Sequence, residues 1–229
     1  MMARETTVAI VWWCALLFLP CATGALAADP FVHPVTDEVE LRSMLSRPAS
    51  KLRNAQVLTG QFRHSRQLRE IPKPLIAQGE FTIVGDLGVI WHTRQPFDSV
   101  VVLTAQGLAQ SDDGGPVQRV SAEAQPAVRL LRNIFMALFT LDTKTLAHDF
   151  DLFGVEDKKE NRWIIGLKPR AKTIAGVFSE ATVSGADAVE QIVLIDARGD
   201  RTVIDLTGIT YSSEPPGADV RALFALPRP

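Results

Sequence analysis

The sequence predicts a mainly β protein with a few helices (α+β), in which a curled antiparallel sheet of about 9–11 strands, an incomplete β-barrel, holds a helical lid in its concave face. Two observations predict the sheet. Apolar and polar residues alternate over 55–109, and short apolar runs separated by evenly spaced turn residues recur over 150–206. The third observation, a strongly apolar segment with a helical period at 128–139, predicts the lid.

Residues 1–27 have the pattern of a cleavable secretory signal peptide. Their apolar run, at 8–19, is shorter than the roughly 20 residues that a membrane-spanning helix needs. Pro20 ends the run, and the small residues Ala25 and Ala27 precede the expected cleavage point. We therefore expect residues 28–229 to form a single domain in the periplasm.

The composition argues against several classes of protein. A formal net charge of −2 and an aromatic content of 7% do not suit a nucleic-acid-binding protein. Both cysteines, Cys14 and Cys21, lie in the expected signal peptide. The exported chain therefore has no disulfide, no thiolate nucleophile and no cysteine-bound metal, which suits a periplasmic protein held together by its core.

The first expected element is a helix over 37–51. Asp37 followed by Glu40 resembles a capping box, and a ragged apolar stripe follows. Pro48 is expected to kink or end this helix.

Residues 55–109 are expected to form an antiparallel meander of about four or five strands. A turn signal at 85–88 precedes a strand on which Val89 and Trp91 share one face. His92 and Arg94 share the other face with Ile90, which makes the division imperfect. We place the first pair inside the sheet, level with two aromatic residues of neighbouring strands, Phe62 and Phe81.

After a loop at 111–115, a helix is expected to start near Pro126, where a proline is tolerated. Its apolar face is broad and consists of Val128, Leu130, Leu131, Ile134, Phe135, Leu138 and Phe139. Such a face can simply complete a core. Alternatively, it closes a cavity that also holds a hydrophobic guest.

The last part of the chain is again expected to be β. Its short runs are 150–155, 163–167, 173–183, 190–195 and 202–206. Because the turns between them are short and evenly spaced, they indicate one large sheet rather than βαβ units.

The search for catalytic chemistry gives no candidate. The sequence has no nucleophile elbow, zinc-protease motif or phosphate-binding loop, and its four histidines have no metal-binding spacing. Asp112 and Asp113 lie in a glycine-rich turn, where solvated aspartates are ordinary. We therefore expect no catalytic residues, no metal and no cofactor, and we do not expect an enzyme.

Three segments resemble the opening strands of the periplasmic outer-membrane lipoprotein carriers (LolA-like). They are LTGQF at 58–62, QGEF at 78–81 and IWHTRQP at 90–96, in the order and at the spacing of that family. GLKP at 166–169, GDRTVI at 199–204 and FALP at 224–227 are similar to the family's closing strands. The resemblance extends over about residues 37–227 and marks the chain as a divergent member.

The resemblance implies a carrier that shields acyl chains in an apolar cavity. It also implies partners: an acylated lipoprotein or envelope lipid, an inner-membrane release complex and an outer-membrane acceptor, with the carrier expected to be a monomer. In the family an Arg-Pro pair precedes the tryptophan strand, and its arginine bonds to the lid. Here the corresponding residues are Val84, Gly85 and Asp86, so we expect a missing or different latch.

We expect nine residues to line the acyl-chain cavity, and they are Phe62, Phe81, Val89, Trp91, Leu131, Ile134, Phe135, Leu138 and Phe139. The sequence does not decide whether the cargo is a lipoprotein or a non-protein lipid or glycolipid with its own export system. A structural envelope protein with a permanent core is the alternative outside the carrier class.

Overall fold

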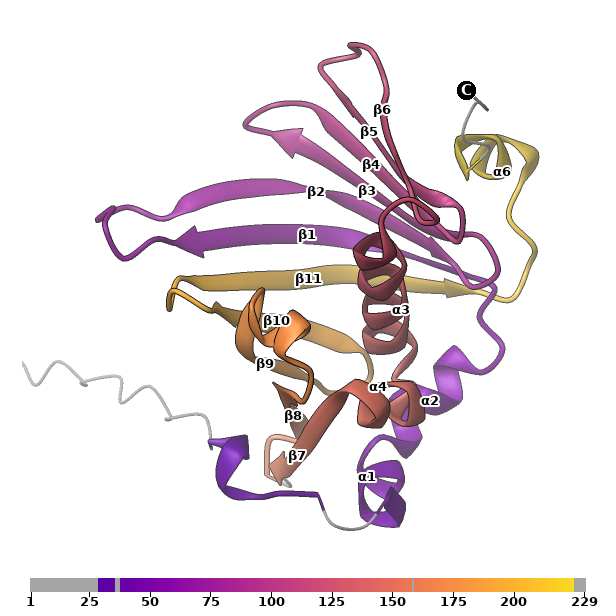
Figure 1. Ribbon diagram of the computed structural model, residues 1–229. Helices are drawn as coiled ribbons and strands as arrows, with labels where there is room; N and C mark the ends of the chain where they lie inside the picture. Colours follow the sequence, from indigo (N-terminus) through magenta and orange to yellow (C-terminus); the bar gives the residue numbers. More distant parts are fainter. Residues whose placement is uncertain (1–28, 36–37, 158, 225–229) are drawn as a thin grey trace, which may run out of the picture.

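The computed structural model describes residues 29–35, 38–157 and 159–224 (Figure 1). The expected signal peptide at 1–27 and the capping residue Asp37 lie outside the described residues. Within the described part, one sheet contains eleven strands in the order β6-β5-β4-β3-β2-β1-β11-β10-β9-β8-β7, and all neighbours are antiparallel. The predicted mainly β fold with one large sheet is therefore confirmed.

The first half of the sheet is a meander, as the alternation predicted. Its strands are β1 (Val57–Gln67), β2 (Leu75–Val84), β3 (Gly88–Gln95), β4 (Ser99–Thr104), β5 (Gly107–Asp112) and β6 (Gln118–Ser121). The second half contains β7 (Phe150–Asp157), β8 (Arg162–Pro169), β9 (Phe178–Gly185), β10 (Val189–Asp196) and β11 (Arg201–Ser212). The long strands β1 and β11 pair with each other and join the two halves.

The sheet bends around α3 (Pro126–Thr140), which lies on its concave side (Figure 1). Pro126 begins the helix, and Leu141 ends it in the left-handed backbone conformation with a φ of 53°. Leu138 and Phe139 are buried in the main core together with residues from both halves of the sheet. The predicted helical lid in the concave face is therefore also confirmed.

The remaining helices are short. They are the 3₁₀ turn η1 (Pro30–Val32), α1 (Glu38–Met44), α2 (Ser46–Leu52), α4 (Thr143–Asp149), α5 (Lys172–Ala175) and α6 (Ala218–Phe224). Leu41 and Leu45, from the α1–α2 segment, and Leu146, from α4, belong to the same core as α3. These helices therefore extend the core beyond the lid.

Two expected elements are divided in the structure. The helix expected over 37–51 becomes α1 and α2, which are separated at Leu45. Pro48 lies in the first turn of α2, where its missing N–H breaks no helical hydrogen bond. The prediction of a strand over 173–183 was wrong in its first part. That part forms α5, whose Ile174 is buried, and β9 begins only at Phe178.

Helix α6 covers part of the convex face of the sheet. Its Phe224 packs with Val84, Ile90 and Val102 in a second, smaller core. Phe224, the first residue of the segment 224–227 that the resemblance assigned to the closing strands, is the last residue of this helix, and 225–227 lie outside the described part. Among the described residues, no helix is long and apolar enough to cross a membrane.

Candidate functional site

Trp91 on β3 is the centre of an aromatic cluster on the concave face. Its ring stacks on Phe62 of β1, with 3.9 Å between ring centroids, and lies 5.9 Å from the ring of Phe81 on β2. Phe81 has room because β1 carries Gly60 beneath it. A side chain at Gly60 would approach the Phe81 ring to 2.7 Å. The glycine therefore lets three neighbouring strands present one continuous aromatic surface.

Two phenylalanines of α3 complete this cluster. Phe135 meets Trp91 edge to face at 5.7 Å, and Phe139 lies 5.4 Å from Phe81. The two helical rings stack on each other at 4.9 Å. Because such pairs contribute beyond the area that they bury, the cluster holds α3 against the sheet.

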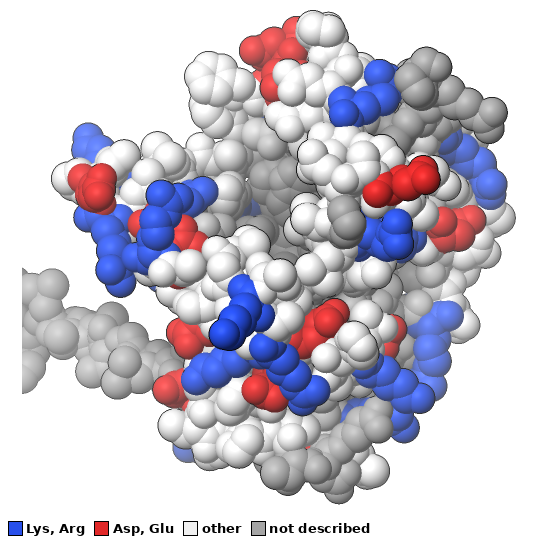
Figure 2. Space-filling view, in the orientation of Figure 1, with Lys and Arg blue, Asp and Glu red and all other residues white. Residues whose placement is uncertain are grey.

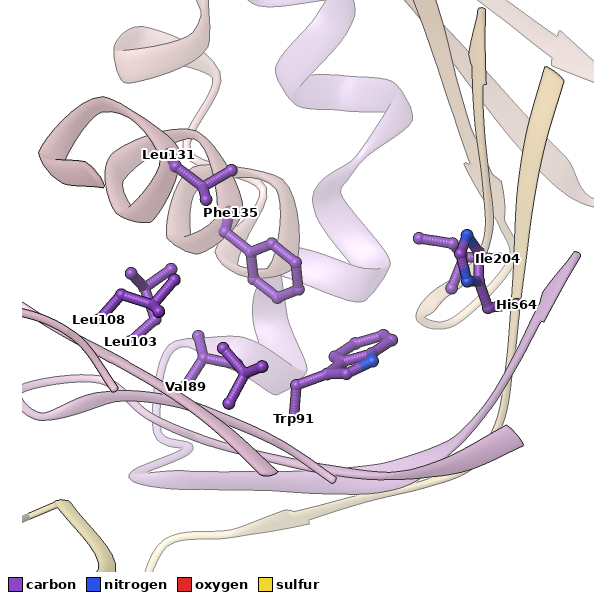
Figure 3. Close-up of a pocket in the computed structure, with 9 residues that line it drawn as sticks. His64, Val89, Trp91, Leu103, Leu108, Leu131, Phe135 and Ile204 are labelled. Carbon is purple, nitrogen blue, oxygen red and sulfur yellow. The ribbon is translucent and has the colours of Figure 1, made fainter. Parts of the chain in front are cut away.

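An apolar cavity of about 230 Å³ lies beside this cluster, between α3 and the sheet (Figure 3). Its lining residues come from α3, from β3 to β5, and from the central strands β1 and β11, and they are His64, Val89, Trp91, Val101, Leu103, Leu108, Leu131, Phe135 and Ile204. Figure 3 shows Phe135 and Leu131 above the cavity, with Val89 and Trp91 below. A cavity this small is under the roughly 300–1,000 Å³ of typical ligand pockets.

The structure brings the expected cavity residues together but gives them different places. Val89, Trp91, Leu131 and Phe135 line the cavity. Phe62, Phe81 and Phe139 lie behind them in the aromatic cluster. Leu138 is buried and Ile134 partly buried in the main core, outside the lining.

The two faces of β3 differ as expected, with one exception. On the outer face the His92 ring lies 2.7 Å from Asp98, and Arg94 donates to Glu80 at 2.7 Å. Ile90 shares this outer face but is buried beneath α6. Its apolar character, which did not fit a solvent-facing position, is explained by a helix that the sequence pattern did not reveal.

Several lining residues were not expected. Val101 and Leu103 belong to a continuous apolar run, in which no alternation shows the inner face. Leu108 and Ile204 each stand beside another apolar residue, Ala109 and Val203, so alternation does not show which of the two faces inward. His64 could have been predicted as a lining residue only from the alternation of faces along β1. It follows Phe62 by two positions and therefore shares the face of Phe62.

His64 is the single titratable side chain of the lining. Burial lowers the pKa of its imidazole, and the nearby Arg66 charge lowers this pKa further. Near neutral pH the ring is therefore uncharged, and the lining presents no formal charge to a guest. Among the described residues, no cluster of histidines, cysteines and carboxylates could hold a metal ion.

The lid is held by packing. In the described part of the chain, no side-chain hydrogen bond or ion pair joins α3 to a strand, and Arg129 of α3 donates instead to the carbonyl oxygen of Ala122 after β6. Leu131, at the N-terminal half of α3, is 48% exposed, whereas Phe139 is 2% exposed. The helix is therefore packed most deeply at its C-terminal half, whereas Val128 is the one buried core residue described in its N-terminal half.

A family model described as "Outer membrane lipoprotein carrier protein LolA" matches residues 53–218. The chain belongs to the LolA family. The expectation of a divergent LolA-like protein is thereby confirmed, and the family is one of lipid and lipoprotein carriers. No curated protein matches the sequence.

Several solved structures are similar to this LolA-family chain at low sequence identity. A LolA superfamily protein from Nitrosomonas europaea is 10% identical, with a TM-score of 0.42 over 76% of this chain and 94% of that chain. A putative outer membrane lipoprotein-sorting protein domain from Vibrio parahaemolyticus is 8% identical, with a TM-score of 0.43 over 80% and 97%. LprF from Mycobacterium bovis is 10% identical, with a TM-score of 0.40 over 81% and 98%.

Proposed function

We propose that this LolA-family protein is a periplasmic carrier that shields the acyl chains of a lipoprotein or lipid during transfer from the inner to the outer membrane. The observation that carries the proposal is the apolar cavity beneath α3, whose lining has no charged group near neutral pH. Acyl chains need apolar surface rather than hydrogen bonds. The proposal includes an exported chain that has lost residues 1–27, an inner-membrane release complex and an outer-membrane acceptor.

A carrier is needed because acyl chains leave a membrane with difficulty. Each buried methylene contributes about 0.8 kcal/mol, so a sixteen-carbon chain resists transfer to water by roughly 12 kcal/mol. The carrier must offer apolar surface of similar quality and later release the chain. A lid that is held by packing, with Val128 as the one buried core residue described in its N-terminal half and Leu131 half exposed, suits both requirements.

In this proposal the structure is the closed state of the carrier. Its cavity of about 230 Å³ is small for a lipid, and the side chains that limit it from above are Leu131 and Phe135 of α3. Movement of the N-terminal half of α3 away from β3 would enlarge the cavity. A ligand that occupies the enlarged space then shifts the population toward the open state.

The test uses tryptophan fluorescence. After removal of residues 1–27, the chain has two tryptophans, Trp91 in the cavity and Trp163 on β8 outside the lining. A fatty acid with bromine atoms in its chain quenches an indole that it touches. We expect it to quench the wild-type protein, and we expect the Trp91→Phe variant to show little quenching although its affinity for the unbrominated acid is retained.

The alternative of a static envelope scaffold gives a different result. A permanent core would admit no fatty acid, so quenching would be absent and organic extraction of the purified protein would release no acyl species. Quenching that persists in Trp91→Phe would place the acyl chain elsewhere. Either result would overturn the proposed cavity as the carrier site.

A further inference from the structure

A second pocket, which we call the mouth pocket, lies where β1 and β2 turn beside the turn between β10 and β11. It has a volume of about 420 Å³. Its lining has five charged and three apolar residues, and consists of Arg66, Leu68, Arg69, Glu70, Ile71, Leu75, Arg198 and Asp200. None of these residues lines the cavity beneath α3, so this pocket has no part in the proposed acyl-chain site.

The strand register connects the mouth pocket to the cavity. Phe62, His64 and Arg66 follow one another on the same face of β1, and the pairing with β11 has no irregularity in this stretch. Opposite them on β11 lie Leu206, Ile204 and Thr202. The concave face thus changes along one line from aromatic, through the neutral His64, to cationic. This order of apolar and charged surface complements an amphiphile whose acyl chain lies in the cavity.

The two aspartates of the β10–β11 turn already have partners. Asp196 accepts hydrogen bonds from the backbone N–H groups of Arg198 and Asp200, at 2.8 and 3.0 Å. Asp200 accepts one from the backbone N–H of Arg69 at 3.1 Å. Both carboxylates also lie near the Arg66 guanidinium, at 3.3 and 3.6 Å. Their charges therefore fix the turn and position Arg66.

Donors remain free at the same place. The Nε of Arg66 is buried and has no hydrogen-bond partner among the described residues. The guanidinium of Arg69 lies against the backbone of Gly199, where a side chain would approach it to 2.0 Å. Within the described residues, neither Arg69 nor Arg198 uses its guanidinium in a hydrogen bond or ion pair. Figure 2 shows basic and acidic side chains together around the turns that protrude on the left of the molecule.

We infer that the mouth pocket binds the phosphodiester headgroup of the amphiphile whose acyl chain occupies the cavity, an inference that rests on the proposed carrier function. Guanidinium groups match the oxygens of a phosphate in geometry and charge. Three arginines face Glu70 and Asp200 in the lining, and Asp196, which lies 3.3 Å from Arg66 just outside it, balances the third positive charge. A site that is near neutral overall but has free guanidinium donors suits a phosphodiester, with one negative charge, better than a phosphomonoester, with up to two.

This inference narrows the class of cargo. The acylated N-terminus of a lipoprotein has no phosphate group, so a phosphodiester site favours a non-protein envelope lipid. The mouth pocket would then select the headgroup, and the cavity would accept the acyl chain with little selectivity.

The test compares two ligands with the same acyl chain. Palmitoyl lysophosphatidylglycerol has a phosphodiester headgroup, and monopalmitoylglycerol has none. Both are titrated below their micelle-forming concentrations, with Trp91 fluorescence as the signal. We expect the phosphodiester lipid to bind about tenfold more tightly at low salt, and we expect added salt to weaken this preference because the contacts are partly exposed.

The double variant Arg69→Gln/Arg198→Gln should lose the preference and keep the affinity for monopalmitoylglycerol. The matched control is Arg63→Gln, because Arg63 is an exposed arginine on the opposite face of the same strand. Equal affinities of the wild-type protein for the two lipids would overturn the headgroup inference alone. Failure of both lipids to bind would overturn the proposed function. Glycerophosphate that binds as tightly as the lipid would identify a site for a water-soluble phosphate instead.

Discussion

At the scale of single residues, Trp91 links the sheet to the lid. It contacts rings of β1 and β2 on one side and Phe135 of α3 on the other, and it also lines the cavity. Its side chain is only partly buried, unlike that of Phe81, which is 1% exposed. In the proposed carrier, Trp91 is therefore placed to touch an acyl chain as well as to hold α3 against the sheet.

The first prediction concerns Trp91→Leu. Loss of the aromatic pairs should cost about 1–2 kcal/mol in the free energy of unfolding, and the transition should stay cooperative. Binding of a fluorescent fatty acid should weaken by roughly tenfold because the guest loses apolar contact area. The control is His92→Gln on the outer face, where glutamine avoids adding a carboxylate beside Asp98 and Glu80. Unchanged binding in Trp91→Leu would exclude Trp91 from the guest site.

His64 gives a prediction about pH. Its pKa in the folded protein is lowered from the ordinary value of 6.5 by burial and by Arg66. Below that value the unfolded chain binds a proton that the folded protein does not yet accept, so stability falls as pH decreases below about 6.5, until the folded-state pKa is reached. His64→Gln should remove this part of the pH dependence. Urea unfolding of both proteins at pH 7.5 and 5.5 checks this prediction. An equal loss of stability between the two pH values in the variant and the wild type would contradict the lowered pKa of His64.

At the scale of elements, the two halves of α3 have different roles. The C-terminal half is buried through Leu138 and Phe139, whereas Leu131 in the N-terminal half is 48% exposed above the cavity. The polar contacts of α3 are local, such as the hydrogen bond from the Thr140 hydroxyl to the Met136 carbonyl oxygen. A movement of its N-terminal half would therefore break few hydrogen bonds.

The prediction for this element compares two truncations. Phe139→Ala should lower the free energy of unfolding by about 3–5 kcal/mol because the ring is fully buried. Leu131→Ala should lower it by less than about 1 kcal/mol because the side chain is half exposed. The same Leu131 variant should change the affinity for a fatty acid, which fluorescence titration measures. A large loss of stability in Leu131→Ala would mean that the whole helix is permanent core.

The sequence predicts long elements with a clear period and misses short ones. The alternation of Phe62, Phe81 and Trp91 with polar residues indicated both the strands and their inner face. Helices α4, α5 and α6 have seven residues or fewer, too short for a helical period to emerge. The cavity lining was predicted only in part. Alternation on β3 indicated that Val89 faces inward, whereas the continuous apolar run of β4 gave no sign that Val101 and Leu103 do.

At the scale of the whole molecule, the open sheet has an apolar surface on each face. The concave one is covered by α3 and contains the cavity. The convex one is smaller, consists of Val84, Ile90 and Val102, and is covered by Phe224 of α6. Because side chains alternate between the faces of a strand, Ile90 packs in the convex core, whereas its neighbours Val89 and Trp91 face the concave cavity. The two surfaces are therefore adjacent in sequence but physically separate.

This separation gives the last prediction. Phe224→Ala should lower the free energy of unfolding by about 3 kcal/mol, because it uncovers Val84, Ile90 and Val102 as well as removing a buried ring. It should leave fatty-acid affinity unchanged, since none of these residues lines the cavity. Leu223→Ala on the same helix is the control, and it should change stability by less than about 0.5 kcal/mol because Leu223 is 58% exposed. Chemical unfolding and fluorescence titration of both variants check the result. A weakened affinity in Phe224→Ala would show that the convex core supports the cavity through the sheet, and the two faces would then act as one cooperative unit.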